Sequence, residues 1–177
     1  MKLSRKFISL LFVCFTLNCS QIYGVSHDYD RNVNFINLKT YNWLPIPENA
    51  NINSLDETRI KNAANIELQN KGLRLINNNP DFFIAEHLVK KDRVNVTNWG
   101  YGYGPYGRYW GTNEVTVYQY EEGTLILDFV NAESKNLIWR GSAKADLDNA
   151  KTPEKRDMLI KASVKKILQN FPPPQGK

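Results

Sequence analysis

Apolar and polar positions alternate with a period of two along much of this chain, which is typical of half-buried β-strands. In residues 81–96, for example, Phe82, Ile84 and Leu88 share one face. Gly123 interrupts the later pattern and is expected to form a turn, so that three short strands build an antiparallel meander there. Extended segments are predicted at residues 25–30, 33–44, 81–96, 114–121, 124–131 and 137–147.

Two other segments repeat their apolar positions every three to four residues, which predicts amphipathic helices. The first helix is expected to begin at Ser54, because Ser54 and Glu57 have the spacing of a capping box. Lys71 and Gly72 suit its last turn and its end. Its apolar stripe consists of Ile60, Ala63, Ala64 and Leu68.

The second helix is expected to begin at Thr152, a good N-cap, with Pro153 in its first turn. Its apolar stripe consists of Ile160, Val164, Ile167, Leu168 and Phe171. Three prolines then start an extended tail, residues 172–177. The strands are expected to form an antiparallel sheet, and both helices can cover one of its faces. The sequence therefore predicts a two-layer α+β domain over residues 25–171. Trp139 and Leu168 should lie in its core, and Leu137 is expected to share the buried face of Trp139.

The N-terminus has the pattern of an export signal rather than of a buried helix or strand. Lys2, Arg5 and Lys6 precede an apolar run at residues 7–17, which is too short to span a bilayer. Cleavage after Gly24 would remove residues 1–24. Cleavage before Cys19 would remove residues 1–18 and leave a thiol for lipidation.

Charge and cysteine content narrow the possible functions. The chain has 23 basic and 18 acidic residues, a net charge of +5, but three of the basic residues belong to the leader. The remainder lacks the clustered basic residues of a nucleic-acid interface. Both cysteines, Cys14 and Cys19, also precede the domain, so no disulfide is expected in it. His27 and His87 lack metal-site spacing, and neither a metal nor a cofactor is expected.

Residues 99–111, WGYGYGPYGRYWG, are rich in glycine and aromatic residues. They contain the spacing of a dinucleotide-binding loop, but Pro105 lies inside it and a predicted strand follows where a helix is required. Two interpretations remain: a hairpin loop that packs on the domain edge or stays mobile, and a contact surface of rigid rings on a flexible backbone. The candidate binding residues are Trp99, Tyr101, Tyr103, Tyr106, Tyr109 and Trp110.

Catalytic signatures are weak. Ser142 follows Gly141 without a downstream histidine, and no nucleophile, zinc-protease or phosphate-loop pattern occurs. A carboxylate pair could in principle serve a hydrolase. The candidates for such a pair are Asp81, Glu86, Glu121, Glu122 and Asp128.

Several segments, taken in order, resemble a family of bacterial envelope proteins known as domain of unknown function 4136, whose members are usually described as lipoproteins. The similar segments are F-x-x-x-K-T-Y-x-W-L-P at 35–45, Arg59-Ile60 to Lys71-Gly72, Pro80-Asp81-Phe82, Gly123-Thr124-Leu125, Leu137 to Gly141 and Phe171-Pro172-Pro173. The resemblance implies an α+β fold and an address in the periplasm or on the periplasmic face of the outer membrane. It implies no activity. Thr16 and Asn18 depart from the residues expected before a lipidated Cys19.

Together these features indicate a non-catalytic envelope domain that binds an envelope protein or glycan and is held at the membrane if Cys19 is lipidated. The first alternative is a structural or assembly protein that acts through an exposed strand edge. The second is a carboxylate-dependent hydrolase.

Overall fold

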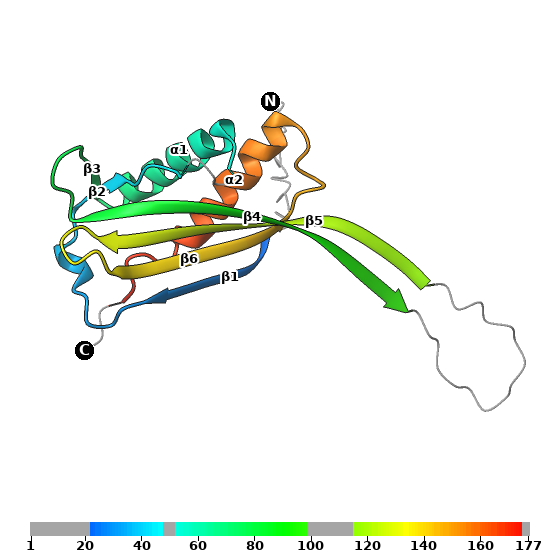
Figure 1. Ribbon diagram of the computed structural model, residues 1–177, viewed down its shortest axis with the longest axis horizontal. Coiled ribbons are helices and arrows are strands. Elements are labelled where there is room, and N and C mark those ends of the chain that lie inside the picture. Colours follow the sequence, from blue (N-terminus) through cyan, green and yellow to red (C-terminus); the bar gives the residue numbers. More distant parts are fainter. Residues whose placement is uncertain (1–21, 48–51, 99–114, 175–177) are drawn as a thin grey trace, which may run out of the picture.

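The computed structural model describes residues 22–47, 52–98 and 115–174. They form a two-layer α+β fold in which two helices cover one face of a six-stranded sheet (Figure 1). The strand order is β1-β6-β5-β4-β2-β3. The elements are β1 Ile22–Tyr29, a 3-10 turn Phe35–Asn37, β2 Thr40–Trp43, α1 Ser54–Asn70, β3 Arg74–Leu75, β4 Phe82–Asn98, β5 Val115–Asn131, β6 Leu137–Asp146 and α2 Pro153–Leu168.

The sheet is mixed, which corrects the expectation of a purely antiparallel one. Strands β1, β6, β5 and β4 pair antiparallel, but β2 pairs in parallel with both β4 and β3. The α1 helix between β2 and β3 explains the second parallel pair, because a helical crossover returns the chain to the same end of the sheet. The segment 33–44 is also not extended throughout, since Asn34 caps the 3-10 turn within it.

Strand β5 runs without a break through Gly123, so the predicted turn at this glycine is wrong. Gly123 pairs with Lys90 on one side and with Ala145 on the other. A Cβ atom at this position would lie 2.7 Å from Cδ2 of Leu147. The glycine therefore makes room for a side chain above the sheet. The antiparallel meander consists of the long strands β4 and β5 followed by β6.

The core is an aromatic cluster between the sheet and the C-terminal end of α2. The ring centroid of Phe129 lies 4.5 Å from that of Phe171 and 4.8 Å from that of Trp139. Trp139 lies over Gly141, where a Cβ atom would overlap the indole ring and come within 2.6 Å of Ile167 Cγ2. The expected burial of Trp139 and Leu168 is confirmed, since both are 0% exposed.

A bulge in β6 changes which neighbours of Trp139 face inward. Trp139 pairs with Phe129, and Leu137 pairs with the next residue, Val130, so Ile138 is an extra residue in β6. Two-against-one pairing of this kind shifts the alternation of faces. Ile138 is consequently buried and Leu137 is 45% exposed, which corrects the expectation that Leu137 shares the buried face of Trp139.

The helix ends follow the sequence signals with one shift. Thr152 caps α2 by accepting a hydrogen bond from the Lys155 amide, as expected. The predicted Ser54–Glu57 capping box does not form, because the N-cap lies at Asn53, one residue before the position that Ser54 would need to occupy as the cap. Asn53 is its N-cap and accepts a hydrogen bond of 2.8 Å from the Asp56 amide. Gly72, with φ +82°, follows the last turn of α1 as predicted.

The buried face of β6 can be tested by truncation. We expect Trp139→Ala to lower the free energy of unfolding by about 3–5 kcal/mol and Leu168→Ala by about 2–5 kcal/mol, because each leaves a cavity in a closed core. Leu137→Ala, the matched control, should cost about 0.5 kcal/mol or less. Urea denaturation measures all three. A larger loss for Leu137→Ala than for Trp139→Ala would contradict the bulge.

Candidate functional site

The β4–β5 hairpin extends well beyond the rest of the domain (Figure 1). The two strands pair along their whole length, from Phe82 opposite Asn131 to Asn98 opposite Val115. Strand β6 ends opposite Glu122, and β2 ends opposite Ile84. Among the described strands, residues 91–98 and 115–121 therefore have only each other as neighbours. We call this two-stranded ribbon the arm.

The aromatic segment predicted to be a binding surface lies outside the described residues, as does its glycine motif. In the sequence, residues 99–114 join the two strands of the arm. The exposed side chains nearest to this connection that the structure describes are Val94, 58% exposed, and Tyr118, 51% exposed. Tyr118 stacks on Tyr120, with their ring centroids 5.9 Å apart.

At the base of the arm, Glu122 links three strands on the sheet face that the helices leave open. Arg93 donates to Glu122 Oε1 from Nη2 at 3.0 Å, and the Tyr23 hydroxyl donates to Glu122 Oε2 at 3.0 Å. Burial acts to raise the pKa of Glu122, but hydrogen bonds from Arg93 and Tyr23 outweigh it and hold this pKa below its ordinary value. Burial and hydrogen bonds to Tyr120 and Glu122 raise the pKa of Tyr23. The cluster ties the arm to β1.

A second polar cluster occupies the same open face, six residues further along β5 and nearer the domain centre. Arg140 forms a two-pronged ion pair with Asp128, with both N–O distances 2.6 Å. His87 Nε2 lies 3.3 Å from Asp128 Oδ2, and its side chain is half exposed. Asp128 also lies on the open face, as its alternation indicates, but it is buried beneath these partners. The cluster cross-links β4, β5 and β6.

On the helical side, a buried ion pair joins the first turns of the two helices. Arg156 Nη2 of α2 donates to Asp56 Oδ2 of α1 at 2.7 Å, and Arg59 adds a contact of 3.0 Å. Burial would raise the pKa of Asp56, but Arg156, Arg59 and Asn53 together lower it. Sequence analysis missed this pair because its members are one hundred positions apart. The available signal was a charge in the first turn of each helix.

Glu86 is the carboxylate that the fold accommodates least well. Its side chain is 0% exposed, beneath α1, and neither oxygen has a hydrogen-bond partner within the described part of the chain. Lys61 Nζ lies 3.5 Å away but also contacts Glu57 at 2.6 Å and the face of Trp43. Burial raises the pKa of Glu86 above its ordinary value, and Lys61 only partly opposes this shift.

The five candidate carboxylates do not meet at one point in the described structure. Asp81 accepts hydrogen bonds from the Lys39 and Thr40 amides at 2.7 and 2.8 Å and fixes β2 beside β4. Glu86 faces the helices, whereas Glu122 and Asp128 face away from them. Glu121 lies 3.7 Å from Lys90 at the base of the arm. Within residues 22–47, 52–98 and 115–174, no cluster of His, Cys, Asp and Glu could hold a metal ion.

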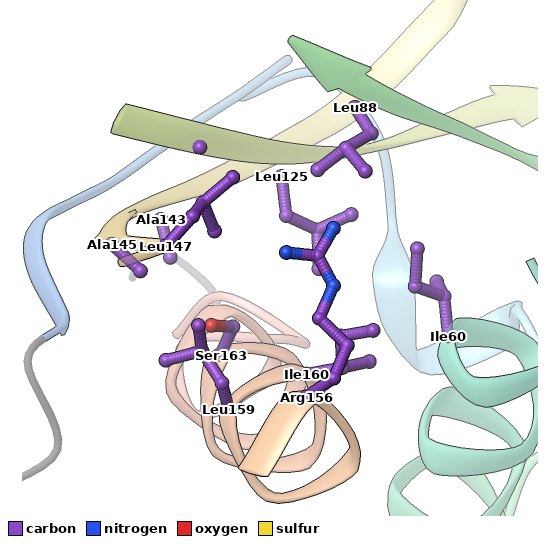
Figure 2. A pocket seen from close by; sticks show the side chains of 11 residues that line it. Ile60, Leu88, Leu125, Ala143, Ala145, Leu147, Arg156, Leu159, Ile160 and Ser163 are labelled. Atoms are coloured by element: carbon purple, nitrogen blue, oxygen red, sulfur yellow. The ribbon is translucent and has the colours of Figure 1, made fainter. Parts of the chain in front are cut away.

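Two hollows lie near the base of the arm. The first, between α2 and the sheet, is lined mainly by aliphatic side chains, with the Arg156 side chain extending into it from α2 (Figure 2). Its volume of about 20 Å³ suffices for roughly one water molecule. The second, of about 290 Å³, is polar and open, and it lies between the arm and the loop after β6. Its residues are Asp92, Arg93, Val94, Gln119, Tyr120, Glu121 and Asp148.

Because Glu86 is buried with a raised pKa, it should make the stability of the protein depend on pH. A raised folded-state pKa means that this residue contributes most stability below its ordinary pKa, and that the contribution is lost as pH rises through the folded value. We therefore expect Glu86→Gln to gain stability relative to the native chain between pH 4 and pH 7. Urea unfolding at both pH values measures this. Glu154→Gln, at an exposed carboxyl, should show no such trend, and a pH-independent difference for Glu86→Gln would contradict the assignment.

The fold has relatives among solved structures. A PDZ domain protein from Parabacteroides distasonis ATCC 8503 superposes with a TM-score of 0.60 at 15% identity. The match covers 88% of this chain but only 36% of that one, so this chain spans about a third of its length. PelC from Paraburkholderia phytofirmans, a dodecamer, gives a TM-score of 0.45 at 11% identity and covers 82% of this chain and 93% of its own. The first likeness supports the α+β fold.

The membership of the chain in a family rests on its sequence. No curated protein matches it. The described residues contain no helix that is long and apolar enough to cross a membrane. The profile of one family matches residues 25–173, which include both helices and almost the whole sheet. The chain therefore belongs to the family described as Domain of unknown function (DUF4136).

Proposed function

We propose that this protein is a non-catalytic component of the bacterial cell envelope that binds another envelope component, a protein or a glycan, through its arm. The observation that carries the proposal is the length of β4 and β5, seventeen residues each, of which the distal parts leave the rest of the sheet. A two-stranded ribbon in water is only marginally stable by itself. The stability of a two-stranded element of this kind increases most when a partner packs against it.

The side chains of the arm support a role in contact. Val94 and Tyr118 are large apolar residues that stay exposed. They project from opposite faces of the arm, so each face offers an apolar contact to a partner. The Tyr118–Tyr120 stack presents ring faces on which a sugar or a peptide can pack. The connecting segment adds further tyrosines and tryptophans in the sequence, with glycines that let them adapt to a partner.

The carboxylates favour binding over hydrolysis. An acid–base pair needs two carboxyl groups that face one reaction space. Here Glu122 and Asp128 are engaged by arginines, and Asp81 is engaged by backbone amides. These contacts give the three residues structural roles.

The strand-edge alternative has an observation of its own. Beyond Ile84, no described strand pairs with the outer edge of β4, and residues from Val89 to Val94 are exposed. An open edge of this length offers backbone donors and acceptors to another extended segment. Binding through the arm and binding through the open edge can operate together, because both surfaces include strand β4.

Removal of the connecting segment tests the binding role. Replacing residues 100–108 with a short Gly-Ser linker should leave the melting temperature almost unchanged, because the aromatic core lies at the other end of the sheet. The same deletion should abolish capture of the partner in a crosslinking experiment on native membranes. Tyr118→Ala should weaken capture, whereas Tyr29→Ala, on β1, should not. Undiminished capture by the deletion variant would contradict a role for the aromatic segment.

The envelope address is tested at Cys19. If its thiol is lipidated, Cys19→Ala should abolish lipid labelling and move the protein out of the detergent phase. Cys14→Ala, inside the apolar run of the leader, is the matched control and should alter neither result. Lipid labelling and membrane association that both persist in Cys19→Ala would contradict a lipid anchor at this position.

A further inference from the structure

We infer that the open edge of β4 pairs with the same edge of a second copy of this chain, as an antiparallel strand pair with Lys91 on its two-fold axis. The inference rests on the strand-edge form of the proposed function and names the occupant of that edge. It would join two six-stranded sheets into one continuous sheet. The open edge is defined as residues 86–94, which begin just after the last β2 pair at Ile84.

Backbone geometry identifies the residues that face this edge. The Leu44 amide donates to the Ile84 carbonyl at 2.8 Å, so the backbone groups of Ile84 point toward β2 and away from β5. Along a strand, the backbone N–H and C=O groups of successive residues point alternately to one side of the strand and to the other. The groups of Leu88, Lys90, Asp92 and Val94 therefore point outward, while those of the residues between them bond to β5. An antiparallel partner strand can pair with these outward groups.

The side chains along this edge are complementary to themselves. Residues 88, 90, 92 and 94 share one face in the order apolar, cationic, anionic, apolar. In an antiparallel pair centred on Lys91, Lys90 of each copy lies opposite Asp92 of the other, and Leu88 lies opposite Val94. Opposite charges and apolar pairs across neighbouring strands are each stabilising. The exposed apolar surface of Val94 would be covered in the same step.

The charges also specify the register. A slip that centres the pair on Lys90 places two lysines opposite each other and Leu88 opposite Asp92. A slip that centres it on Asp92 places two aspartates opposite each other. Directly opposed like charges are destabilising, so only the Lys91-centred register gives every residue of this face a suitable neighbour.

The other face of the pair contains one unfavourable contact. The two Lys91 side chains meet at the axis, and their like charges repel each other. Within each copy, however, Lys91 lies opposite Glu122, whose carboxylate is already on that face. Long lysine side chains can also direct their ammonium groups to solvent. Val89 lies opposite Arg93, whose guanidinium is held by Glu122.

The extent of the open edge suits this arrangement. In the Lys91-centred register, position 96 of one copy lies opposite Glu86 of the other, and Ile84, the next outward residue, is already bonded by Leu44. The pairing between the two copies therefore stops just before Ile84, where β2 and Leu44 already occupy this edge of β4. It supplies a third strand along residues 91–96 of each arm, and a sheet of three or more strands is much more stable than a two-stranded ribbon.

A charge exchange tests both the dimer and its register. We expect the purified full-length protein to form dimers in sedimentation velocity runs at increasing concentration. Lys90→Asp alone and Asp92→Lys alone should each weaken association about tenfold or more, because each converts two attractive contacts per dimer into repulsive ones. The double variant Lys90→Asp with Asp92→Lys exchanges both charges and should restore dimerisation at an unchanged net charge. A native chain that stays monomeric, single variants that dimerise normally, or a double variant that stays monomeric would each overturn the inference.

A disulfide provides an independent check of the axis. Position 91 would form a non-hydrogen-bonded pair with its copy, with Cα atoms about 4.5 Å apart, within the range that a disulfide bridges. Oxidised Lys91→Cys should therefore run as a covalent dimer, and Lys71→Cys, at the exposed end of α1, should not. Circular dichroism of each variant confirms that it is folded.

The outcome is separable from that of the proposed function. A monomeric Lys90→Asp variant that still captures an envelope partner supports binding through the arm. If the charge series shows that the dimer does not form while capture by the native chain persists, the inference fails and the proposed function stands. If the dimer forms as described but neither an envelope partner nor a glycan is captured through the arm, the inference stands and the proposed function fails.

Discussion

The unbroken pairing of β4 with β5 is the constraint on which the rest of this structure depends. Its register runs through Gly123 without a slip, so the half under the helices and the half in the arm belong to one continuous ladder. The helical half obtains its stability from the cluster around Phe129, Trp139 and Phe171. The distal half has no such cover among the described residues. A stable domain therefore carries the arm, whose two strands cannot bury their own outer edges.

Polar contacts reinforce this division of the molecule. On the open face, Glu122 ties β4 to the neighbouring strands where the arm begins, and Asp128 does so nearer the domain centre. On the helical face, the Asp56–Arg156 ion pair holds the two helices together at their first turns. The two pairs on the open face, whose arginine side chains are about half exposed, contribute modestly to stability, but they orient the strands that they join.

Much of this architecture could be predicted from the sequence, and the exceptions have physical causes. The spacing of apolar residues located both helices and the two faces of β4, because burial on one side of an element requires apolar residues at regular intervals along it. Gly123 was misjudged because glycine serves a tight turn and a close approach of side chains equally well, and only the position of Leu147 separates the two. The parallel β2–β4 pair and the open edge depend on neighbours distant in sequence, and local patterns do not encode them.

Amide exchange measured residue by residue with NMR tests most directly whether the β4 edge is open and what covers it. In dilute protein, the Val89, Lys91 and Arg93 amides should exchange slowly, because they bond to β5. The Leu88, Lys90, Asp92 and Val94 amides should exchange fast and then become protected as the protein concentration rises. Equal protection of both sets in dilute solution would show that the edge is already covered within one chain. Fast exchange of the second set at every concentration, with no partner that slows it, would contradict its role as a binding edge.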